Sequence, residues 1–351
     1  MRCLVDYHHG DLHWSLHSLF ENRLGFDLYH PVGHDWFEKG FWRIAEVYGN
    51  APDTIDQFLA ISEDTEHFDQ FKRLNGIATE YRDYWKVWDP THGYDRNCVT
   101  FNQFFNWHWD LIIATLPCQE EPFRQLAKEK GCAFAVQMGN YKQTTSAKHV
   151  LYSAPYAPTA GQNALYYHQE VDRGLLFYEP PLRRQLDGRP RITSMVNLHP
   201  NAEVWEAYLN EMPDCAFSAF GANCPDGPLK GCVEIAPWLR NSNLGWNLKP
   251  FDGFSHTAMA WYASGRPCVV RMADIMASGM DAPNLFEDGV TCLAIDGLSV
   301  QDGAKKIRHA LEPEENLRMC EAARDRFKVV CNYDLEELQI RGWLEKVLND
   351  S

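Results

Sequence analysis

Residues 249–270 read KPFDGFSHTAMAWYASGRPCVV, which is an acidic Gly-containing loop, a short helical stretch, a Gly-X-Pro stop and an apolar strand. Ser255 is suited to cap the helix start, because its hydroxyl can accept a hydrogen bond from a first-turn amide. Gly265 is placed for a left-handed C-terminal cap, and Pro267 prevents the helix from continuing. A helix that begins after such a loop points amides and the positive end of its dipole outward. The stretch therefore predicts an anion site, above all for phosphate.

This stretch resembles the donor-binding loop and helix of GT-B glycosyltransferases, especially those of the retaining family-4 type. That family has an acidic residue followed by Gly-Phe-Gly, an Ala-rich helix and then Gly-X-Pro-Val-Val, and residues 252–255 (DGFS) and 265–270 (GRPCVV) match it. Residues 284–293 (NLFEDGVTCL) look like the family's ELIEDGVNGLLV segment, and residues 321–327 (EAARDRF) look like its EAARERF helix. Together these motifs extend the resemblance over roughly the last third of the chain.

The resemblance implies roles for individual residues of the loop and helix. Asp252 stands where the family has an acidic residue near the hydroxyls of the transferred sugar, so it is a catalytic candidate. The candidates for binding the donor diphosphate and sugar are Gly253, Phe254, Ser255, His256, Thr257 and Lys249. One position departs from the pattern, because Ala260 replaces the Glu that binds the donor ribose in the family.

Length and composition narrow the class of protein. The chain has 351 residues, enough for two domains, with 45% hydrophobic and 23% charged residues. Neither a run of eighteen apolar residues nor a signal-peptide-like start is present, so we expect no membrane span. The eleven cysteines are scattered without a CxxC pair, which indicates reduced thiols and a cytoplasmic protein. The net charge of −15 disfavours a general polyanion binder.

The first part of the chain alternates predicted strands and helices, as in a doubly wound α/β domain. We expect strands at residues 2–6, 26–32, 109–115, 133–137, 149–153 and 174–178, and helices at 12–22, 36–47, 53–63, 66–73 and 123–130. The Pro- and Gly-rich residues 179–190 are the best linker candidate.

A second alternating series follows the linker. It has expected strands at residues 191–198, 215–220 and 231–235, a helix at 201–210, and an amphipathic last helix at 334–348. The predicted fold is α/β, with two Rossmann-like domains facing across a cleft, the GT-B architecture. The expected acceptor domain is residues 1–180 and the nucleotide-sugar domain residues 181–332, and residues 333–351 are expected to cross back to the first domain.

Polar residues directly follow the first expected strand, where ligands of doubly wound domains bind. Asp11 or His9 could act as general base toward an acceptor hydroxyl, and a neutral His is suited to proton transfer near pH 7. The other acceptor-side candidates are His8, Gly10 and Asn140. Asp11 could also simply cap the next helix. His8, His9, His13 and His17 could instead bind a metal, but no carboxylate or Cys completes a zinc pattern, so no metal is expected.

Further basic residues could reach a phosphate. Arg183, Arg184, Arg189 and Arg191 cluster at the expected linker, where a solvated surface is the alternative explanation. Lys230 and Arg240 are weaker diphosphate candidates than Lys249, which is nearest the acidic loop.

These observations predict a glycosyltransferase that uses a nucleotide-diphosphate sugar, with a UDP-sugar as the default donor and no cofactor. If the family-4 likeness holds, the anomeric configuration is retained. The acceptor is a saccharide, a small molecule or a hydroxymethylated DNA base; the last follows from a resemblance of residues 6–21 to bacteriophage glycosyltransferase-like proteins. The alternatives are a sugar-nucleotide epimerase of the same architecture and an inactive sugar-nucleotide-binding protein, which the replacement at Ala260 suggests.

Overall fold

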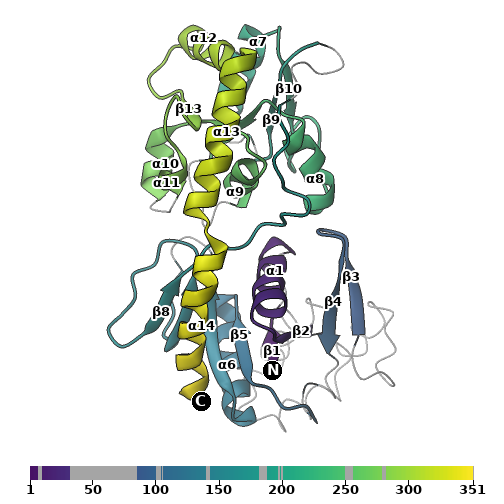
Figure 1. The fold of residues 1–351 in the computed structure, drawn as a ribbon, viewed down its shortest axis with the longest axis vertical. Helices are drawn as coiled ribbons and strands as arrows, with labels where there is room; N and C mark the ends of the chain where they lie inside the picture. Colours follow the sequence, from purple (N-terminus) through teal and green to yellow (C-terminus); the bar gives the residue numbers. More distant parts are fainter. Residues whose placement is uncertain are drawn as a thin grey trace. The chain divides into compact units, whose positions relative to one another are not determined.

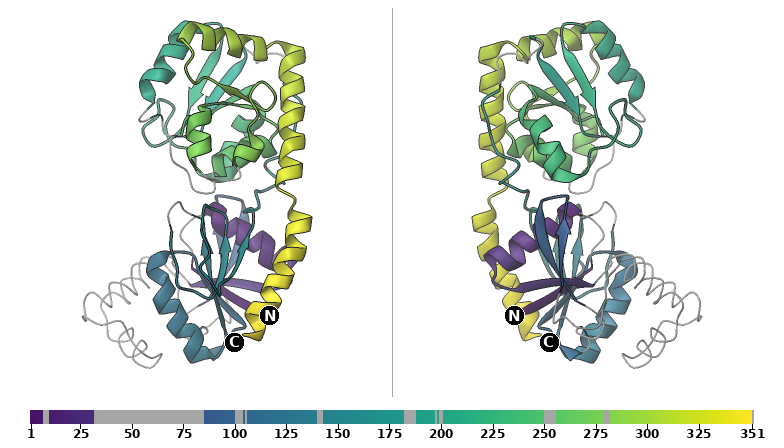
Figure 2. Two further views of the ribbon diagram at one scale, coloured as in Figure 1. Left: turned by 90° about the vertical axis from the view of Figure 1, so that its left-hand side faces the viewer. Right: turned by 90° about the vertical axis from the view of Figure 1, so that its right-hand side faces the viewer.

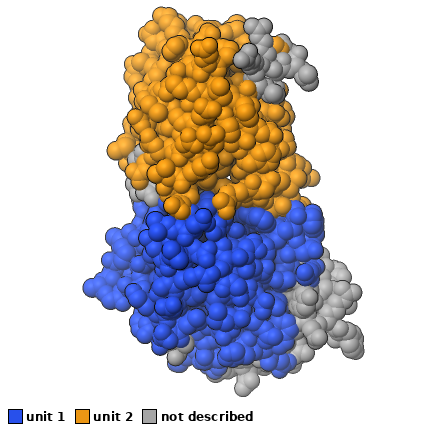
Figure 3. Space-filling view, viewed as in Figure 1, with its two compact units in different colours: residues 1–89, 93–170, 333–351 blue, residues 90–92, 171–332 orange. Residues whose placement is uncertain are grey.

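The computed structural model describes residues 1–6, 10–31, 85–99, 104, 106–139, 143–181, 188–196, 198, 201–249, 256–278 and 282–350. The chain divides into two compact units, which Figure 3 shows in different colours. Unit 1 comprises Met1–Asp89, Gly93–Glu170 and Tyr333–Ser351, and unit 2 comprises Pro90–His92 and Val171–Asn332. The last helix of the chain thus belongs to the same unit as the first strand.

Unit 1 is built on an eight-stranded sheet with the order β3-β4-β2-β1-β5-β6-β7-β8. The strands are β1 (Arg2–Val5), β2 (Asp27–Pro31), β3 (Trp85–Asp89), β4 (Tyr94–Val99), β5 (Leu111–Ala114), β6 (Ala133–Met138), β7 (His149–Tyr152) and β8 (Asn163–Tyr166). All neighbouring strands are parallel except β3 and β4. Strand β5 is buried along its whole length, as expected where helices cover both faces of a parallel sheet.

Helices cover both faces of this sheet (Figures 1 and 2). Helix α6 (Glu120–Lys130) packs on one face, where Phe123 joins the core. The other face carries α1 (Gly10–His17), the π-helix η1 (Ser18–Arg23) and α14 (Tyr333–Asn349), whose Trp343 and Val347 are buried. The Trp343 indole donates to the Asn163 carbonyl at 2.8 Å, which fixes α14 to the edge strand β8.

Unit 2 contains a five-stranded, fully parallel sheet with the order β10-β9-β11-β12-β13. Its strands are β9 (Arg191–Ser194), β10 (Ala216–Ala219), β11 (Leu244–Trp246), β12 (Cys268–Val270) and β13 (Cys292–Ala294). The helices are α7 (Ala202–Glu211), α8 (Gly231–Arg240), α9 (His256–Ala263), α10 (Met272–Ser278), α11 (Ala282–Leu285), α12 (Val300–Ala310) and α13 (Pro313–Val330). This alternation gives a second Rossmann-like sheet, so the predicted α/β fold class is confirmed.

The main segment of unit 2 begins at Val171, earlier than the linker expected at residues 179–190, because Arg240 at the end of α8 donates to the carbonyl of Leu175, which lies ahead of that linker. The fully buried guanidinium of Arg266 donates to the Glu179 carbonyl at 2.8 Å and to the Leu239 carbonyl at 3.3 Å. These hydrogen bonds replace the water that the charged group loses on burial, and they hold the incoming chain against the end of α8.

Two expected strands are wrong. Residues 231–235 form the first half of α8, because a short apolar run fits a strand or a helix, and here Cys232, Ala236 and Leu239 form a helical buried face. Residues 174–178 form turns, since the Asp172 carboxylate accepts from the Gly174 amide at 2.9 Å and folds the chain back. Strands β3, β4, β8, β11 and β13 were not expected. The helices expected at 36–47, 53–63 and 66–73 lie outside the described residues.

The cysteines whose side chains the structure describes are buried or half-buried and form no disulfide. Burial raises the pKa of Cys132, Cys215 and Cys292 to about 12, so these thiols stay protonated and act as small apolar side chains. Within the described parts of the chain, no helix has the length and apolarity required to cross a bilayer.

Candidate functional site

The carboxyl ends of the five parallel strands gather the candidate residues of unit 2 at one edge of its sheet. Helix α9 connects β11 to the neighbouring parallel strand β12. In this pair of strands, Gly245 of β11 lies opposite Cys268 of β12. A helix in such a crossover starts at the carboxyl edge of the sheet and returns to the amino edge. The first turn of α9 therefore lies beside the segments that follow β11 and β12, where ligands bind in α/β sheets of this kind.

The C-terminal end of α9 has the predicted left-handed cap. Gly265 has a φ of 64°; its amide donates to the Tyr262 carbonyl at 2.9 Å, and the Arg266 amide donates to the Trp261 carbonyl at 2.8 Å. This pair of hydrogen bonds is the Schellman motif, which is favoured by Gly because it has no Cβ. With Ala258, Met259, Trp261 and Tyr262 buried, the cap holds α9 rigidly against the core.

The amino end of α9 carries two of the predicted binding residues. His256 and Thr257 form its first turn and are half-buried. Lys249 is exposed, three residues after the end of β11, so the chain places it at the same edge. Asp252, Gly253, Phe254 and Ser255 lie outside the described residues, and the roles expected for them stay predictions. Ala260, at the position of the family's ribose-binding Glu, lies on α9 itself.

A hydrogen-bonded network at this edge was missed by the sequence analysis. Arg271, the first residue after β12, donates from Nη1 to Asn201 Oδ1 at 2.9 Å, and Asn201 Nδ2 donates to the Leu248 carbonyl at 3.0 Å. Asn201 is buried directly before α7, so the network joins the segments after β9, β11 and β12. The other guanidinium N–H groups of Arg271 have no hydrogen-bond partner within the described residues. The sequence feature that could have identified Arg271 is the position of a basic residue directly after a buried apolar strand.

The neighbouring helix α10 does not offer a comparable site. The Asp296 carboxylate, which follows β13, accepts from the amides of Met272 at 2.7 Å and Ala273 at 3.1 Å. A carboxylate of the chain thus already neutralises the positive end of α10. Lys249 and Arg271 are two of the described basic groups at this edge.

In unit 1 the structure describes two of the predicted residues that follow β1. Gly10 and Asp11 form the first turn of α1, where a carboxylate is favoured by the helix dipole. His8, His9 and Asn140 lie outside the described residues. His13 Nδ1 lies 2.7 Å from the Tyr94 hydroxyl, and His17 Nδ1 lies 2.9 Å from Glu21 Oε2. Over the described ranges, no three His, Cys, Asp or Glu side chains are arranged to hold a metal ion.

Asp6 is a second residue that the sequence analysis missed. It ends the apolar run of β1, is 2% exposed, and accepts hydrogen bonds from the amides of Thr115 at 2.8 Å and Leu116 at 3.2 Å. Burial raises the pKa of its carboxyl to about 7, although these hydrogen bonds act in the opposite direction. Asp6 therefore fastens the carboxyl ends of β1 and β5 together and titrates near neutral pH.

The weaker basic candidates mostly have structural roles. The Arg191 guanidinium lies 4.9 Å from the centre of the Trp238 ring. Arg240 ends α8, a helix that runs toward the amino edge of the sheet, and donates to the Leu175 carbonyl. Lys230 directly precedes α8, while Arg183 and Arg184 lie outside the described residues.

Comparisons with known proteins agree on the fold. No protein-family model and no curated protein sequence matches the chain. Among solved structures, a sucrose-phosphate synthase from Thermosynechococcus elongatus aligns over 100% of both chains with a TM-score of 0.61 at 11% identity. Anabaena HepE, crystallised with UDP and glucose, covers 96% of this chain and 99% of its own, with a TM-score of 0.56 at 11% identity. A glycosyltransferase from Rickettsia africae aligns over 100% of this chain and 99% of its own, with a TM-score of 0.59 at 9% identity.

These alignments over essentially whole chains show that the protein has the GT-B fold, in which two Rossmann-like domains follow one another. The predicted resemblance to GT-B glycosyltransferases is thereby confirmed at the level of fold.

Proposed function

We propose that the chain is a glycosyltransferase that moves a sugar from a nucleotide-diphosphate sugar, by default a UDP-sugar, to an acceptor hydroxyl. The observation that carries this proposal is the position of α9, whose first turn lies at the carboxyl edge of the parallel sheet of unit 2. Support also comes from the shared GT-B fold, since HepE was crystallised with UDP and glucose and with UDP-glucose.

The chemistry required of the site is stabilisation of the charge that develops on the leaving diphosphate. The amides of His256 and Thr257 and the dipole of α9 supply fixed positive charge at one point. Arg271 adds a guanidinium held in place by Asn201, and the exposed Lys249 adds an ammonium. Groups that are already oriented in the free enzyme stabilise such charge with little reorganisation, which favours transfer.

In this proposal Asp252 binds the hydroxyls of the transferred sugar, and unit 1 supplies the acceptor side through Gly10, Asp11 and the neighbouring histidines. A retaining reaction would follow from the family-4 likeness, in which the donor's own phosphate helps to take the acceptor proton. Asp11 or His9 is the alternative general base.

The test is to measure nucleoside diphosphate release from a panel of nucleotide sugars with saccharide, small-molecule and hydroxymethylated-DNA acceptors. Asp252→Ala and His256→Ala should each lower turnover substantially without changing the unfolding temperature. Wild-type rates in both variants with the true donor would refute the assigned site. Conversion of the donor to an epimeric nucleotide sugar without any acceptor and without net release of nucleoside diphosphate would instead indicate an epimerase.

A second candidate is favoured by Ala260, which removes the carboxylate expected at the donor ribose. An inactive sugar-nucleotide-binding protein would bind the donor, raising the unfolding temperature, but would neither hydrolyse nor transfer it. Alanine at position 260 can also leave room for a different nucleotide, so the donor panel should include UDP-, GDP- and ADP-sugars.

A further inference from the structure

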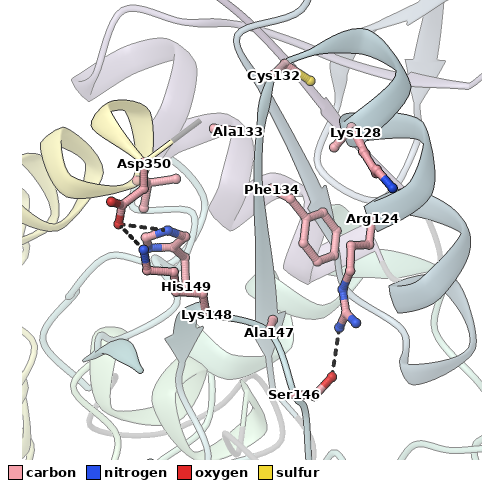
Figure 4. A pocket seen from close by; sticks show the side chains of 12 residues that line it. Arg124, Lys128, Cys132, Ala133, Phe134, Ser146, Ala147, Lys148, His149 and Asp350 are labelled. Carbon is pink, nitrogen blue, oxygen red and sulfur yellow. Dashed lines mark hydrogen bonds and ion pairs between the residues drawn. The ribbon is translucent and has the colours of Figure 1, made fainter. Parts of the chain in front are cut away.

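Unit 1 contains a pocket of about 380 Å³ at the amino edge of its sheet, where β6 and β7 begin (Figure 4). Its walls come from α6, from the starts of the two strands and from the end of α14. Active sites of parallel α/β sheets lie at the opposite, carboxyl edge. The pocket is consequently separate from the candidate acceptor residues, and its volume suits a small ligand of one ring with a substituent.

The basic side chains of one wall of the pocket already contact a carboxylate of the same chain. The Asp350 carboxylate, just past α14, lies 2.8 Å from Lys148 Nζ and 3.5 Å from His149 Nε2, and Lys148 holds the pKa of this carboxyl below its usual value (Figure 4). Asp350 is exposed, so an ion pair of this kind adds little to stability and can be exchanged for an external anion.

His149 is oriented to donate a hydrogen bond into this wall. Asn163 Nδ2 donates to the Trp343 carbonyl at 3.3 Å, which assigns the amide nitrogen, and the same nitrogen lies 3.1 Å from His149 Nδ1. Nδ1 must therefore accept, and the proton of the neutral ring is on Nε2, which faces Asp350. Burial lowers the pKa of His149, so this neutral tautomer is the form at pH 7.

The opposite wall is basic and apolar. Lys128 on α6 is exposed, and its ammonium has no hydrogen-bond or ion-pair partner within the described residues. Arg124 is already neutralised: it donates to Glu120, to Glu121 at 3.0 Å and to Ser146 at 2.9 Å. The Arg124 guanidinium carbon lies 5.7 Å from the centre of the Phe134 ring, and Ala127, Cys132 and Val347 complete the apolar surface.

We propose that this pocket binds a small phosphate monoester with a flat, apolar carbon part. The phosphate would take the place of the Asp350 carboxylate against Lys148 and His149, with Lys128 adding long-range attraction, and the ring would lie against Phe134. Charge-assisted hydrogen bonds from Lys148 favour a dianionic phosphate over the single charge of Asp350. Binding would release Asp350, so the ligand competes with the end of the chain's own last helix.

The test uses the full chain and isothermal titration with phenyl phosphate, inorganic phosphate and phenol. Phenyl phosphate should bind most tightly, because it alone uses both the basic and the apolar wall. Lys148→Ala should weaken its binding at least tenfold, while Asp350→Asn should tighten it several-fold by removing the competing carboxylate. Lys86→Ala, at an exposed lysine on the edge strand β3, is the matched control and should change nothing.

Opposite effects of Lys148→Ala and Asp350→Asn cannot come from general loss of structure, since both side chains are 40% exposed or more. The proposal is overturned if phenyl phosphate does not bind, if Lys148→Ala leaves its affinity unchanged, or if Asp350→Asn weakens binding. Competition by UDP would place the probe at the nucleotide site and would also overturn it. Unchanged affinity in excess UDP would support a second site, whether or not the chain transfers sugars.

Discussion

Replacing Gly265 by Ala should destabilise unit 2 through two separable effects. A side chain at φ 64° costs about 1–2 kcal/mol, because a Cβ crowds the following carbonyl in this conformation. An added Cβ would also lie 2.4 Å from Tyr178 Cδ2 and 3.2 Å from the Cys320 carbonyl oxygen. The Tyr178 ring has little room to move away, because the Arg324 guanidinium packs over it, with its central carbon 4.7 Å from the ring centre. Such overpacking typically costs a further 1–3 kcal/mol or so.

Gly289→Ala provides the matched control. Gly289 has a φ of 74°, but an added Cβ there would meet no atom within 4 Å, so only the conformational cost applies. In thermal unfolding followed by circular dichroism, Gly265→Ala should lower the unfolding temperature by roughly 2 °C or more beyond the control, at about 2–4 °C per kcal/mol. Equal unfolding temperatures for the two variants would refute the packing argument, and a rise in Gly265→Ala would refute the assigned cap as well.

Three other predictions concern charged side chains. The buried Asp6 has its pKa raised from 3.8 to about 7, so between these pH values the folded state keeps a proton that the unfolded state loses. The contribution of Asp6 to stability should therefore fall by an amount on the order of 4 kcal/mol as the pH rises from 4 to 8. Urea midpoints at both pH values should show a change that is more destabilising in the wild type than in Asp6→Asn, and parallel pH profiles would contradict the prediction. Arg266→Met should lower the urea midpoint of unfolding, because the carbonyls of Glu179 and Leu239 lose their buried donor, at about 1–3 kcal/mol for each unsatisfied group; an unchanged midpoint would show that the guanidinium is dispensable. Arg271→Ala should weaken nucleotide-sugar binding by about 10- to 100-fold, which corresponds to the loss of one hydrogen bond to a charged group. Arg318→Ala, on the exposed face of α13, is the control and should leave the affinity unchanged. Equal affinities of the two variants in titration would show that Arg271 is not part of the site.

The sequence predicts an element well where the local residue pattern and the tertiary packing favour the same structure. Strand β5 is a continuous apolar run, and α9 is bounded by an apolar strand and a Gly-X-Pro stop, so local pattern and tertiary packing favour the same structure. The left-handed conformation of Gly265 follows from the same logic, because a helix that must end there needs a residue without a Cβ.

The errors have a common physical origin in short segments. Residues 231–235 are a short, mostly apolar run that fits a strand as well as a helix, and the helical face formed by Cys232, Ala236 and Leu239 becomes visible only when the run is extended to Arg240. Strand β8 has four half-buried residues and is identified by its pairing with β7, a contact between positions 14 residues apart. Long-range pairing of this kind leaves a weak local pattern in a single sequence.

The site was predictable in its helix but not in its network. A sequence motif identifies α9, whereas Asn201 and Arg271 are 70 residues apart and meet only because β9 and β12 lie near one another in the parallel sheet. Asp6 was similarly hidden, because its environment depends on the amides of residues after β5, 109 positions along the chain.

The most direct test of the central claim is a crystal structure of the chain with UDP bound. The account predicts that the diphosphate oxygens lie within hydrogen-bonding distance of the amides of His256 and Thr257 at the start of α9, with the Arg271 guanidinium beside them. A diphosphate bound elsewhere, or an α9 amino end occupied by a side chain of the protein in that structure, would contradict it.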